Sequence, residues 1–183
     1  LITTASADVP LKGLDYSLRA LEILKKEFPE IHLVVIGAPK KNGHTERLIR
    51  KLKIKEIITF RSNLTKKEIA EEYSKSSISI VSSLYEGFGY PVIEAMSCGT
   101  PLIATNISSI PELVGGYATL IDPKNYKALA ASIRKILSDY ESFEEIAVRG
   151  REHIIKTFNW DKITKEYESI ILKTIEDFKN ADI

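Results

Sequence analysis

Two carboxylates bracket a short stretch of the chain that contains two glycines and a proline. Glu86 and Glu94 flank the seven residues Gly-Phe-Gly-Tyr-Pro-Val-Ile, which lead from an apolar run into a helical pattern. A helix N-terminus has free N–H groups and a partial positive charge, and Gly87 and Gly89 leave room for a ligand to approach that backbone. The stretch is therefore a candidate phosphate cradle. Glu86 would repel a phosphate and is better suited to accept hydrogen bonds from ligand hydroxyls.

Glu94 lies one helical turn after Tyr90, so it can reach a second group of hydroxyls on the same side. A ligand with a charged middle and a polyol at each end fits this arrangement, and a nucleotide sugar has that shape. The stretch matches neither the G-x-G-x-x-G loop of dinucleotide sites nor a P-loop. Plainer alternatives stay open at this point, because a loop glutamate is often only solvated and a glutamate in a first turn often serves the helix dipole.

Other kinds of catalytic site have little support in the sequence. His32, His44 and His153 show no metal-ligand spacing with Cys98 or with acids, and no Asp-x-Asp occurs, so we expect no metal and no cofactor. The serines lack the G-x-S-x-G elbow of hydrolases. Cys98 precedes a glycine that ends a helical pattern and is expected to be a small buried apolar residue.

Short β-branched runs alternate with helical patterns along the chain. Strands are expected at 1–6, 31–37, 57–60, 77–82, 102–105 and 118–121, and helices at 14–28, 45–53, 65–73, 91–97, 126–137, 143–157 and 160–178. Capping boxes are expected at Thr65 and at Ser109, each with a glutamate three residues later. Trp160 and Tyr167 share a helix face and are expected to pack.

This order of elements predicts an α/β fold with a Rossmann-like, doubly wound parallel sheet of about six strands, covered by helices on both faces. Ligands of such sheets bind beyond the carboxyl ends of the strands, near the point where the strand order reverses. The stretch between the two glutamates follows the fourth expected strand and therefore lies at that edge.

The composition narrows the class of protein. The chain has 183 residues and a net charge of +1, with 44% hydrophobic and 28% charged residues, which suits one globular domain. Acidic residues are interleaved with the lysines, so we expect no nucleic-acid partner. A single cysteine and the lack of a signal peptide or membrane-length apolar run favour a cytoplasmic location. Because the chain begins with Leu1 inside a β-like run, we expect it to be a fragment.

Several motifs resemble, in the right order, those of retaining nucleotide-sugar glycosyltransferases of family four, the glycosyl transferases group 1, whose two Rossmann-like domains form the GT-B architecture. The segment EGFGYPVIE is similar to their signature of two glutamates with seven residues between them, and AMSCGTPLIATNISSIPELVGG is similar to the segment that follows it. Upstream, PLKGLDYSLRAL resembles the Lys-Gly motif that opens the donor domain, and FNWDKITKEYESI resembles the closing helix. The resemblance covers nearly the whole chain and is specific for the family, not for the substrate.

The resemblance implies roles for the motif residues. Glu86 would bind hydroxyls of the donor sugar, and Glu94 the ribose hydroxyls. Backbone N–H groups around Phe88 to Pro91 would face the sugar and the distal phosphate, although Pro91 itself has no N–H to donate. The same stretch includes Gly87, Gly89 and Tyr90 as donor-binding residues.

Other segments complete the implied site. Lys12 would lie against the diphosphate and stabilise the charge of the leaving group, and Gly13 would let the helix start approach. Phe60 and Arg61 would lie in the loop that flanks the base. Ala7 occupies the place where relatives commonly carry an arginine, which makes Lys12 the only nearby cation of this segment.

The resemblance implies that residues 1–183 form the C-terminal, donor-binding domain of a glycosyltransferase, with the C-terminal helices at about 142–178. The N-terminal acceptor domain, absent from this chain, would be its partner, and the resemblance allows peripheral membrane association through that domain. The implied reaction is transfer of a sugar from a UDP-, GDP- or ADP-linked donor to an acceptor hydroxyl, with retention of configuration. Alternatives are an epimerase or a phosphorylase of similar fold, or a binding module without activity.

Overall fold

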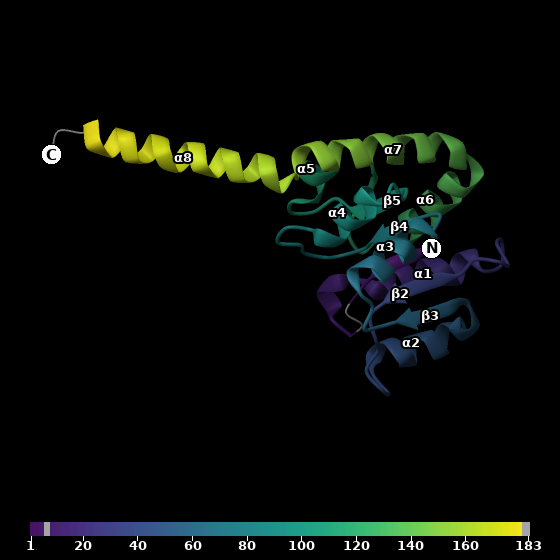
Figure 1. The fold of residues 1–183 in the computed structure, drawn as a ribbon. Helices are drawn as coiled ribbons and strands as arrows, with labels where there is room; N and C mark the ends of the chain where they lie inside the picture. Colours follow the sequence, from purple (N-terminus) through teal and green to yellow (C-terminus); the bar gives the residue numbers. More distant parts are fainter. Residues whose placement is uncertain (6–7, 181–183) are drawn as a thin grey trace.

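A six-stranded parallel sheet forms the centre of the molecule in the computed structural model, which describes residues 1–5 and 8–180 (Figure 1). The strands are β1 (Ile2–Thr4), β2 (Leu33–Ile36), β3 (Ile58–Arg61), β4 (Ser79–Val81), β5 (Leu102–Thr105) and β6 (Thr119–Ile121). Their order in the sheet is β3-β2-β1-β4-β5-β6, and every pair of neighbours is parallel. The strand order reverses between β1 and β4, as in a doubly wound Rossmann-like sheet.

Helices cover both faces of the sheet. They are α1 (Leu14–Leu24), α2 (His44–Leu52), α3 (Lys66–Ser74), α4 (Tyr90–Ser97), α5 (Ile110–Val114), α6 (Tyr126–Ser138), α7 (Tyr140–Thr157) and α8 (Trp160–Asn180), with 3₁₀ turns η1 (Pro10–Lys12) and η2 (Lys55–Ile57). Apolar residues of α1, α2 and α6 form one buried cluster, and those of α3, α4, α5 and α7 form the other. The predicted α/β fold and its six strands are therefore confirmed.

The central strands are buried on both faces, whereas the edge strand β3 is not. All four residues of β5 are buried, which matches its uninterrupted apolar run. In β3 the side chains of Thr59 and Arg61 are exposed and those of Ile58 and Phe60 are partly buried against the α1–α2 layer. This alternation places successive side chains of β3 on opposite faces of the sheet.

One of the two predicted capping boxes forms and the other does not. Thr65 Oγ1 accepts from the Glu68 N–H, and Glu68 in turn accepts from the Thr65 N–H at 2.7 Å. Ser109 caps nothing with its side chain, because its Oγ donates to the Phe88 carbonyl at 2.9 Å instead. The prediction at Ser109 was wrong, because its hydroxyl forms a hydrogen bond with a residue distant in sequence and not with the N–H groups at the helix start.

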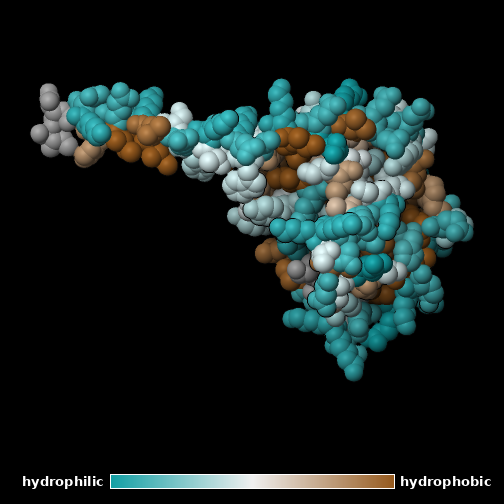
Figure 2. Space-filling model, viewed as in Figure 1, coloured by the Kyte–Doolittle hydropathy of each residue, from teal (hydrophilic) through white to brown (hydrophobic). Residues whose placement is uncertain are grey.

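The last helix, α8, projects from the body of the domain (Figure 1). None of its residues is buried, and Trp160 and Tyr167 remain 78% and 65% exposed. The prediction that these two side chains pack was wrong, because the helix leaves the domain and its apolar stripe stays on the surface (Figure 2). Of the helices that the structure describes, none has the length and apolarity needed to cross a membrane.

Candidate active site

The candidate site lies at the carboxyl ends of β1 and β4, the two neighbouring strands at which the sheet order reverses. The η1 turn follows β1, and the segment with Glu86 follows β4 and leads into α4. A hydrogen bond of 2.7 Å from the Leu84 N–H to the Leu11 carbonyl joins these two segments. Two segments that are far apart in the sequence are thereby held side by side.

Lys12 and Glu86 form an ion pair in this site. The distance from Lys12 Nζ to Glu86 Oε1 is 2.8 Å, and Ser83 Oγ donates to the same oxygen at 2.6 Å. Glu86 is buried, with 7% of its side chain exposed, whereas Lys12 is 31% exposed. No hydrogen bond from the described residues reaches Glu86 Oε2, and an ammonium has three N–H groups, so both partners keep bonding capacity for a ligand.

Gly13 packs the turn with Lys12 against the end of β4. Its φ is +64°, and a Cβ there would lie 1.8 Å from the Ser82 carbonyl oxygen. The Ser82 hydroxyl donates to the Gly13 carbonyl at 2.9 Å and also meets Ser17 Oγ at 2.9 Å. Gly13 therefore allows the close approach of two backbone segments that brings Lys12 to Glu86.

The two glycines between the glutamates have different structural roles. Gly89 has a φ of +96° and would place a Cβ 2.8 Å from Leu113 Cδ1, so the fold itself requires glycine at this position. Apart from its chain neighbours, no described residue has an atom within 4 Å of the position that a Cβ of Gly87 would take, so the missing side chain keeps space open in front of the site. Packing within the domain therefore explains why residue 89 is a glycine, but it does not explain why residue 87 is one.

Backbone N–H groups are available at the start of α4. The Gly89 carbonyl accepts from the N–H groups of Val92 and Ile93, which begin the helical hydrogen-bond ladder. Within residues 1–5 and 8–180, no acceptor takes up the N–H groups of Phe88, Gly89 or Tyr90. These three donors lie close in sequence to Glu86 and can bind an anion.

The α4 helix begins one residue earlier than expected, so Pro91 stands in its second position. The exposed rings of Phe88 and Tyr90 lie at its start. The Phe88 ring contacts the Tyr90 ring edge to face, with 5.1 Å between centroids, and lies 5.9 Å from the ring of Phe158. Phe158 follows α7 and was not predicted for this site, because only the fold brings the end of α7 to α4.

Glu94 is an exposed residue of α4, and its carboxylate oxygen Oε2 lies 3.4 Å from the hydroxyl of Tyr73. Desolvation of the carboxylate raises the pKa of Glu94 above its ordinary value, and the hydrogen bond from Tyr73 opposes that shift only in part. The α4 dipole does not explain the position of Glu94, which lies after the first turn. The Tyr73 contact was not predicted, because Tyr73 looks like an ordinary core aromatic in the sequence.

Replacement of Glu94 by glutamine should stabilise the fold more at neutral than at acidic pH. A raised folded-state pKa means that Glu94 favours folding below its unfolded pKa and loses that contribution as the pH rises through the folded pKa. Glutamine stays neutral, so the gain in unfolding free energy of Glu94→Gln over wild type should be larger at about pH 7.5 than at about pH 4. Urea unfolding at both values measures this, with Glu112→Gln on α5 as an exposed first-turn control. An equal difference at both values would contradict the prediction.

Phe60 and Arg61 form the end of β3, as the strand expected at 57–60 indicated for Phe60, and do not lie in the loop that the resemblance implied for them. Phe60 lines a cavity of about 340 Å³ between β3 and α2, and Arg61 pairs with Glu72 of α3 at 3.5 Å. Two strands, β2 and β1, separate β3 from the β4 segment that carries Glu86. The structure therefore does not bring Phe60 to the Lys12–Glu86 pair. Ala7 lies outside the described residues.

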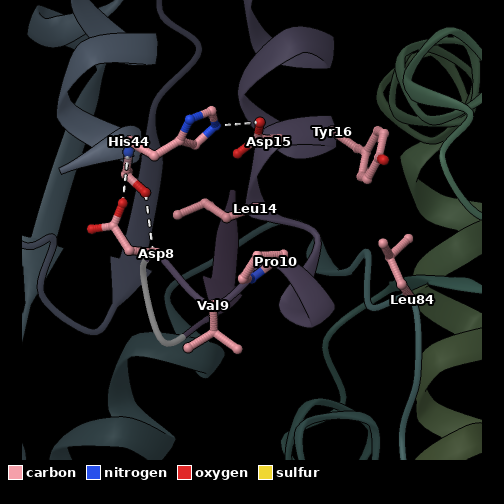
Figure 3. A pocket seen from close by; sticks show the side chains of 9 residues that line it. Asp8, Val9, Pro10, Leu14, Asp15, Tyr16, His44 and Leu84 are labelled. Atoms are coloured by element: carbon pink, nitrogen blue, oxygen red, sulfur yellow. Dashed lines mark hydrogen bonds and ion pairs between the residues drawn. The ribbon is translucent and has the colours of Figure 1, made fainter.

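A second cavity, of about 300 Å³, lies on the α1–α2 side of the η1 turn (Figure 3). Val9 and Pro10 form part of its wall, and His44 Nε2 lies 2.7 Å from Asp15 Oδ2 at its rim. Asp8 accepts hydrogen bonds of 2.8 Å from the N–H groups of Lys40 and Thr45 and so anchors the loop before α2. No local pattern predicts the pairing of His44 with an acid, because the partners lie on different helices.

A comparison with known protein families decides the class of this fold. The model of the family "Glycosyl transferases group 1" matches residues 1–153. The chain belongs to this family. Its Rossmann-like domain, with the paired Lys12 and Glu86 at the strand switch, is thus a glycosyl transferases group 1 domain, and the prediction of group 1 membership is confirmed.

Relatives of this group 1 domain include a mannosyltransferase and a sucrose-phosphate synthase. The chain is 33% identical over 178 residues to the MMP alpha-(1->4)-mannosyltransferase of Mycolicibacterium hassiacum, covering 96% of this chain and 43% of that protein. It is 26% identical to a solved sucrose-phosphate synthase from Thermosynechococcus elongatus, with a TM-score of 0.84, covering 96% of this chain and 45% of the other. An Anabaena protein solved in complex with UDP-glucose shares the fold, with 21% identity, a TM-score of 0.83 and coverage of 94% and 48%. The chain thus spans less than half the length of these relatives.

Proposed function

We propose that this domain binds a nucleotide-diphosphate sugar and serves as the donor half of a retaining glycosyltransferase of family four. The observation that carries the proposal is the Lys12–Glu86 ion pair, 2.8 Å long, at the strand switch. The segment that carries Glu86 continues into the N–H groups of Phe88, Gly89 and Tyr90, which have no acceptor among the described residues. A diphosphate carries negative charge that an ammonium and backbone N–H groups offset, and a carboxylate next to them accepts from hydroxyls. The relatives' glycosyltransferase names support the reaction class.

In this proposal the donor lies along the β4–α4 segment. Its diphosphate lies between the Lys12 ammonium and the N–H groups that precede α4, and Gly87 leaves the space for it. The second oxygen of Glu86 accepts from hydroxyls of the sugar, while Glu94 on α4 accepts from the ribose hydroxyls. Phe60 and Arg61 stay candidates for the base end only, since they belong to the far strand β3.

Catalysis in this proposal is mainly positioning and charge stabilisation. The acceptor hydroxyl attacks the anomeric carbon from the face that the diphosphate leaves, so the new carbon–oxygen bond forms as the bond to the phosphate oxygen breaks. The leaving phosphate takes the proton of the acceptor hydroxyl. Lys12 stabilises the negative charge that develops on the leaving diphosphate, and the proposal assigns neither a protein nucleophile nor a metal.

The proposal for the whole protein is a cytoplasmic enzyme with two domains. Residues 1–183 bind the UDP-, GDP- or ADP-linked donor, and an N-terminal domain supplies most of the acceptor site. A binding module without activity is the second candidate, because Ala7 stands where relatives commonly carry an arginine. Release of nucleoside diphosphate from the sugar donor by the full-length protein separates the two, since an inactive module binds the donor without cleaving it.

Two substitutions should distinguish binding of the nucleotide end of the donor from binding of its sugar end. We expect Glu94→Gln to weaken binding of the free nucleoside diphosphate and of its sugar alike, whereas Glu86→Gln should weaken only the sugar. A hydrogen bond to a charged group contributes about 1.5–3 kcal/mol, which corresponds to roughly tenfold to a hundredfold in affinity. Glutamine keeps one acceptor oxygen, so the losses should lie near the low end.

The measurement is calorimetric titration of each variant with UDP, GDP and ADP and then with the sugar of the tightest one, in the presence of EDTA. Glu112→Gln, an exposed first-turn glutamate on the neighbouring α5, is the matched control and should bind both ligands like wild type. Equal small effects of both substitutions on both ligands would remove the assignment. Loss of all binding in EDTA would show that a metal is needed.

A further inference from the structure

Tyr73 places a hydroxyl group in the interior, between the end of β1 and the α4 helix. It lies near the end of α3 and is 1% exposed, with its ring in the apolar cluster of α3, α4 and α5. Its hydroxyl is 2.7 Å from Thr4 Oγ1, at the end of β1, and 3.4 Å from Glu94 Oε2. The tyrosine thus connects the last residue of β1 to the carboxylate on α4.

The direction of these hydrogen bonds follows from the chemistry of the groups. An ionised carboxylate only accepts, so the Tyr73 hydroxyl donates to Glu94 and is then free to accept from the Thr4 hydroxyl. In the described part of the chain, no other side chain forms a hydrogen bond with the Glu94 carboxylate. Tyr73 is therefore the contact that restricts the orientation of this carboxylate.

A purely structural role explains the ring of Tyr73 but not its hydroxyl. The ring belongs to the same buried cluster as Ile2, Val81 and Val92, where a phenylalanine would fill the space equally well. Burial of a hydroxyl has a desolvation cost that only hydrogen bonds offset, so the contacts with Thr4 and Glu94, and not packing, account for the phenol. The hydroxyl is explained if the orientation of Glu94 matters.

We propose that Tyr73 is a positioning residue, which holds Glu94 Oε2 so that the other carboxylate oxygen faces the hydroxyls of the nucleotide ribose, with Thr4 orienting the Tyr73 hydroxyl from the opposite side. This inference rests on the proposed function, in which Glu94 binds the ribose. Glu94 is exposed and has several rotamers open to it without such a contact. Fixing one of them before the nucleotide arrives lowers the entropy cost of binding.

The test compares ribonucleotides with their deoxy forms. The tightest of UDP, GDP and ADP is titrated against wild type together with its 2′-deoxy and 3′-deoxy analogues, and the ratio of their affinities reports the ribose contact. Tyr73→Phe should reduce the ratio of ribonucleotide affinity to deoxynucleotide affinity by about 3–10-fold. The deoxy analogue that lacks the hydroxyl bound by Glu94 should bind this variant as tightly as it binds wild type. Thr4→Val, which keeps the shape of the side chain, should reduce the ratio less and in the same direction.

Tyr117→Phe is the matched control. Tyr117 packs against the same apolar cluster and against the His153 ring, 5.5 Å between centroids, and no hydrogen bond of its hydroxyl occurs among the described residues. This variant should keep the wild-type ratio. Thermal unfolding of each variant checks the fold, and Thr4→Val carries the test if Tyr73→Phe fails to fold.

The outcomes separate this inference from the proposed function. If Tyr73→Phe keeps the wild-type ratio, or weakens ribonucleotide and deoxynucleotide equally, Tyr73 is only a packing residue and the inference is overturned. If wild type binds nucleoside diphosphates without any preference for the ribose hydroxyls, Glu94 does not bind the ribose, and the inference fails although diphosphate binding stands. If wild type binds no nucleotide at all, the proposed function and the inference both fail.

Discussion

Replacement of Lys12 by methionine should lower the affinity for a nucleoside diphosphate by about tenfold to a hundredfold and leave the affinity for the bare nucleoside unchanged. Methionine keeps the length of the side chain, which is 31% exposed in Lys12, but removes the ammonium and its N–H groups beyond the one bound to Glu86. Because the leaving diphosphate gains charge during transfer, turnover of the donor should fall further, by about a hundredfold to a thousandfold. Titration with the diphosphate, the monophosphate and the nucleoside measures the first effect.

The ion pair itself requires a control, because Lys12→Met leaves Glu86 buried with only the Ser83 hydroxyl as a partner. The loss of one partner of a buried pair destabilises a fold, although the exposure of Lys12 reduces that cost here. The double variant Lys12→Met with Glu86→Gln removes the uncompensated charge and should recover most of the lost stability without recovering diphosphate affinity. An exposed lysine of α3, Lys66→Met, should change neither quantity. A nucleoside affinity that falls as much as the diphosphate affinity would show that Lys12 acts through the fold alone.

The second large effect is expected on stability. Gly13→Ala should lower the free energy of unfolding by about 2–5 kcal/mol, because it combines a left-handed backbone conformation with a steric overlap. The φ of Gly13 is +64°, and its Cβ would lie 1.8 Å from the Ser82 carbonyl oxygen, which belongs to the backbone and cannot rotate away. The turn that carries Lys12 would have to separate from the end of β4. Urea unfolding of the variant measures the loss.

Gly116→Ala separates the cost of the left-handed backbone conformation from the cost of the steric overlap. Gly116 has a φ of +85°, but in the described part of the chain no atom beyond its two neighbours lies within 4 Å of its Cβ position, so only the backbone strain applies. That variant should lose about 1–2 kcal/mol, clearly less than Gly13→Ala. Equal losses in the two variants would mean that the contact between Gly13 and Ser82 is not tight in solution. The structure also predicts that Gly13→Ala weakens the hydrogen bond from Leu84 to Leu11, which hydrogen exchange at Leu84 detects.

Most of the fold was predictable from local patterns. The runs around β2 and β5 are apolar and β-branched. Such runs are typical of strands in a parallel sheet that is covered by helices on both faces, where polar side chains are rare. The capping box at Thr65 formed because both of its partners lie within one turn. Patterns of this range depend only on neighbouring residues, so no tertiary contact was needed to find them.

Patterns that depend on distant partners were less reliable. Ser109 has the same local pattern as Thr65, but its hydroxyl binds the carbonyl of Phe88. Trp160 and Tyr167 share a helix face with nothing in the described chain to cover it. In each case a residue elsewhere in the fold, or the lack of one, overrode the local rule.

In the candidate site, too, local sequence features were predictable and contacts between distant residues were not. The sequence by itself determined the types of residue in it: a lysine before a glycine, two glutamates with seven residues between them, and glycines at a helix start. All of these are recognisable because they follow one another along the chain. Only the tertiary structure decided that Lys12 and Glu86 form an ion pair, that Ser83 shares its oxygen, and that Tyr73 reaches Glu94. These contacts depend on which strands lie next to each other, and the sheet order β1-β4 places the ends of distant segments within hydrogen-bond distance. Strand order is set by burial of whole helix and sheet faces, which no local stretch of sequence encodes.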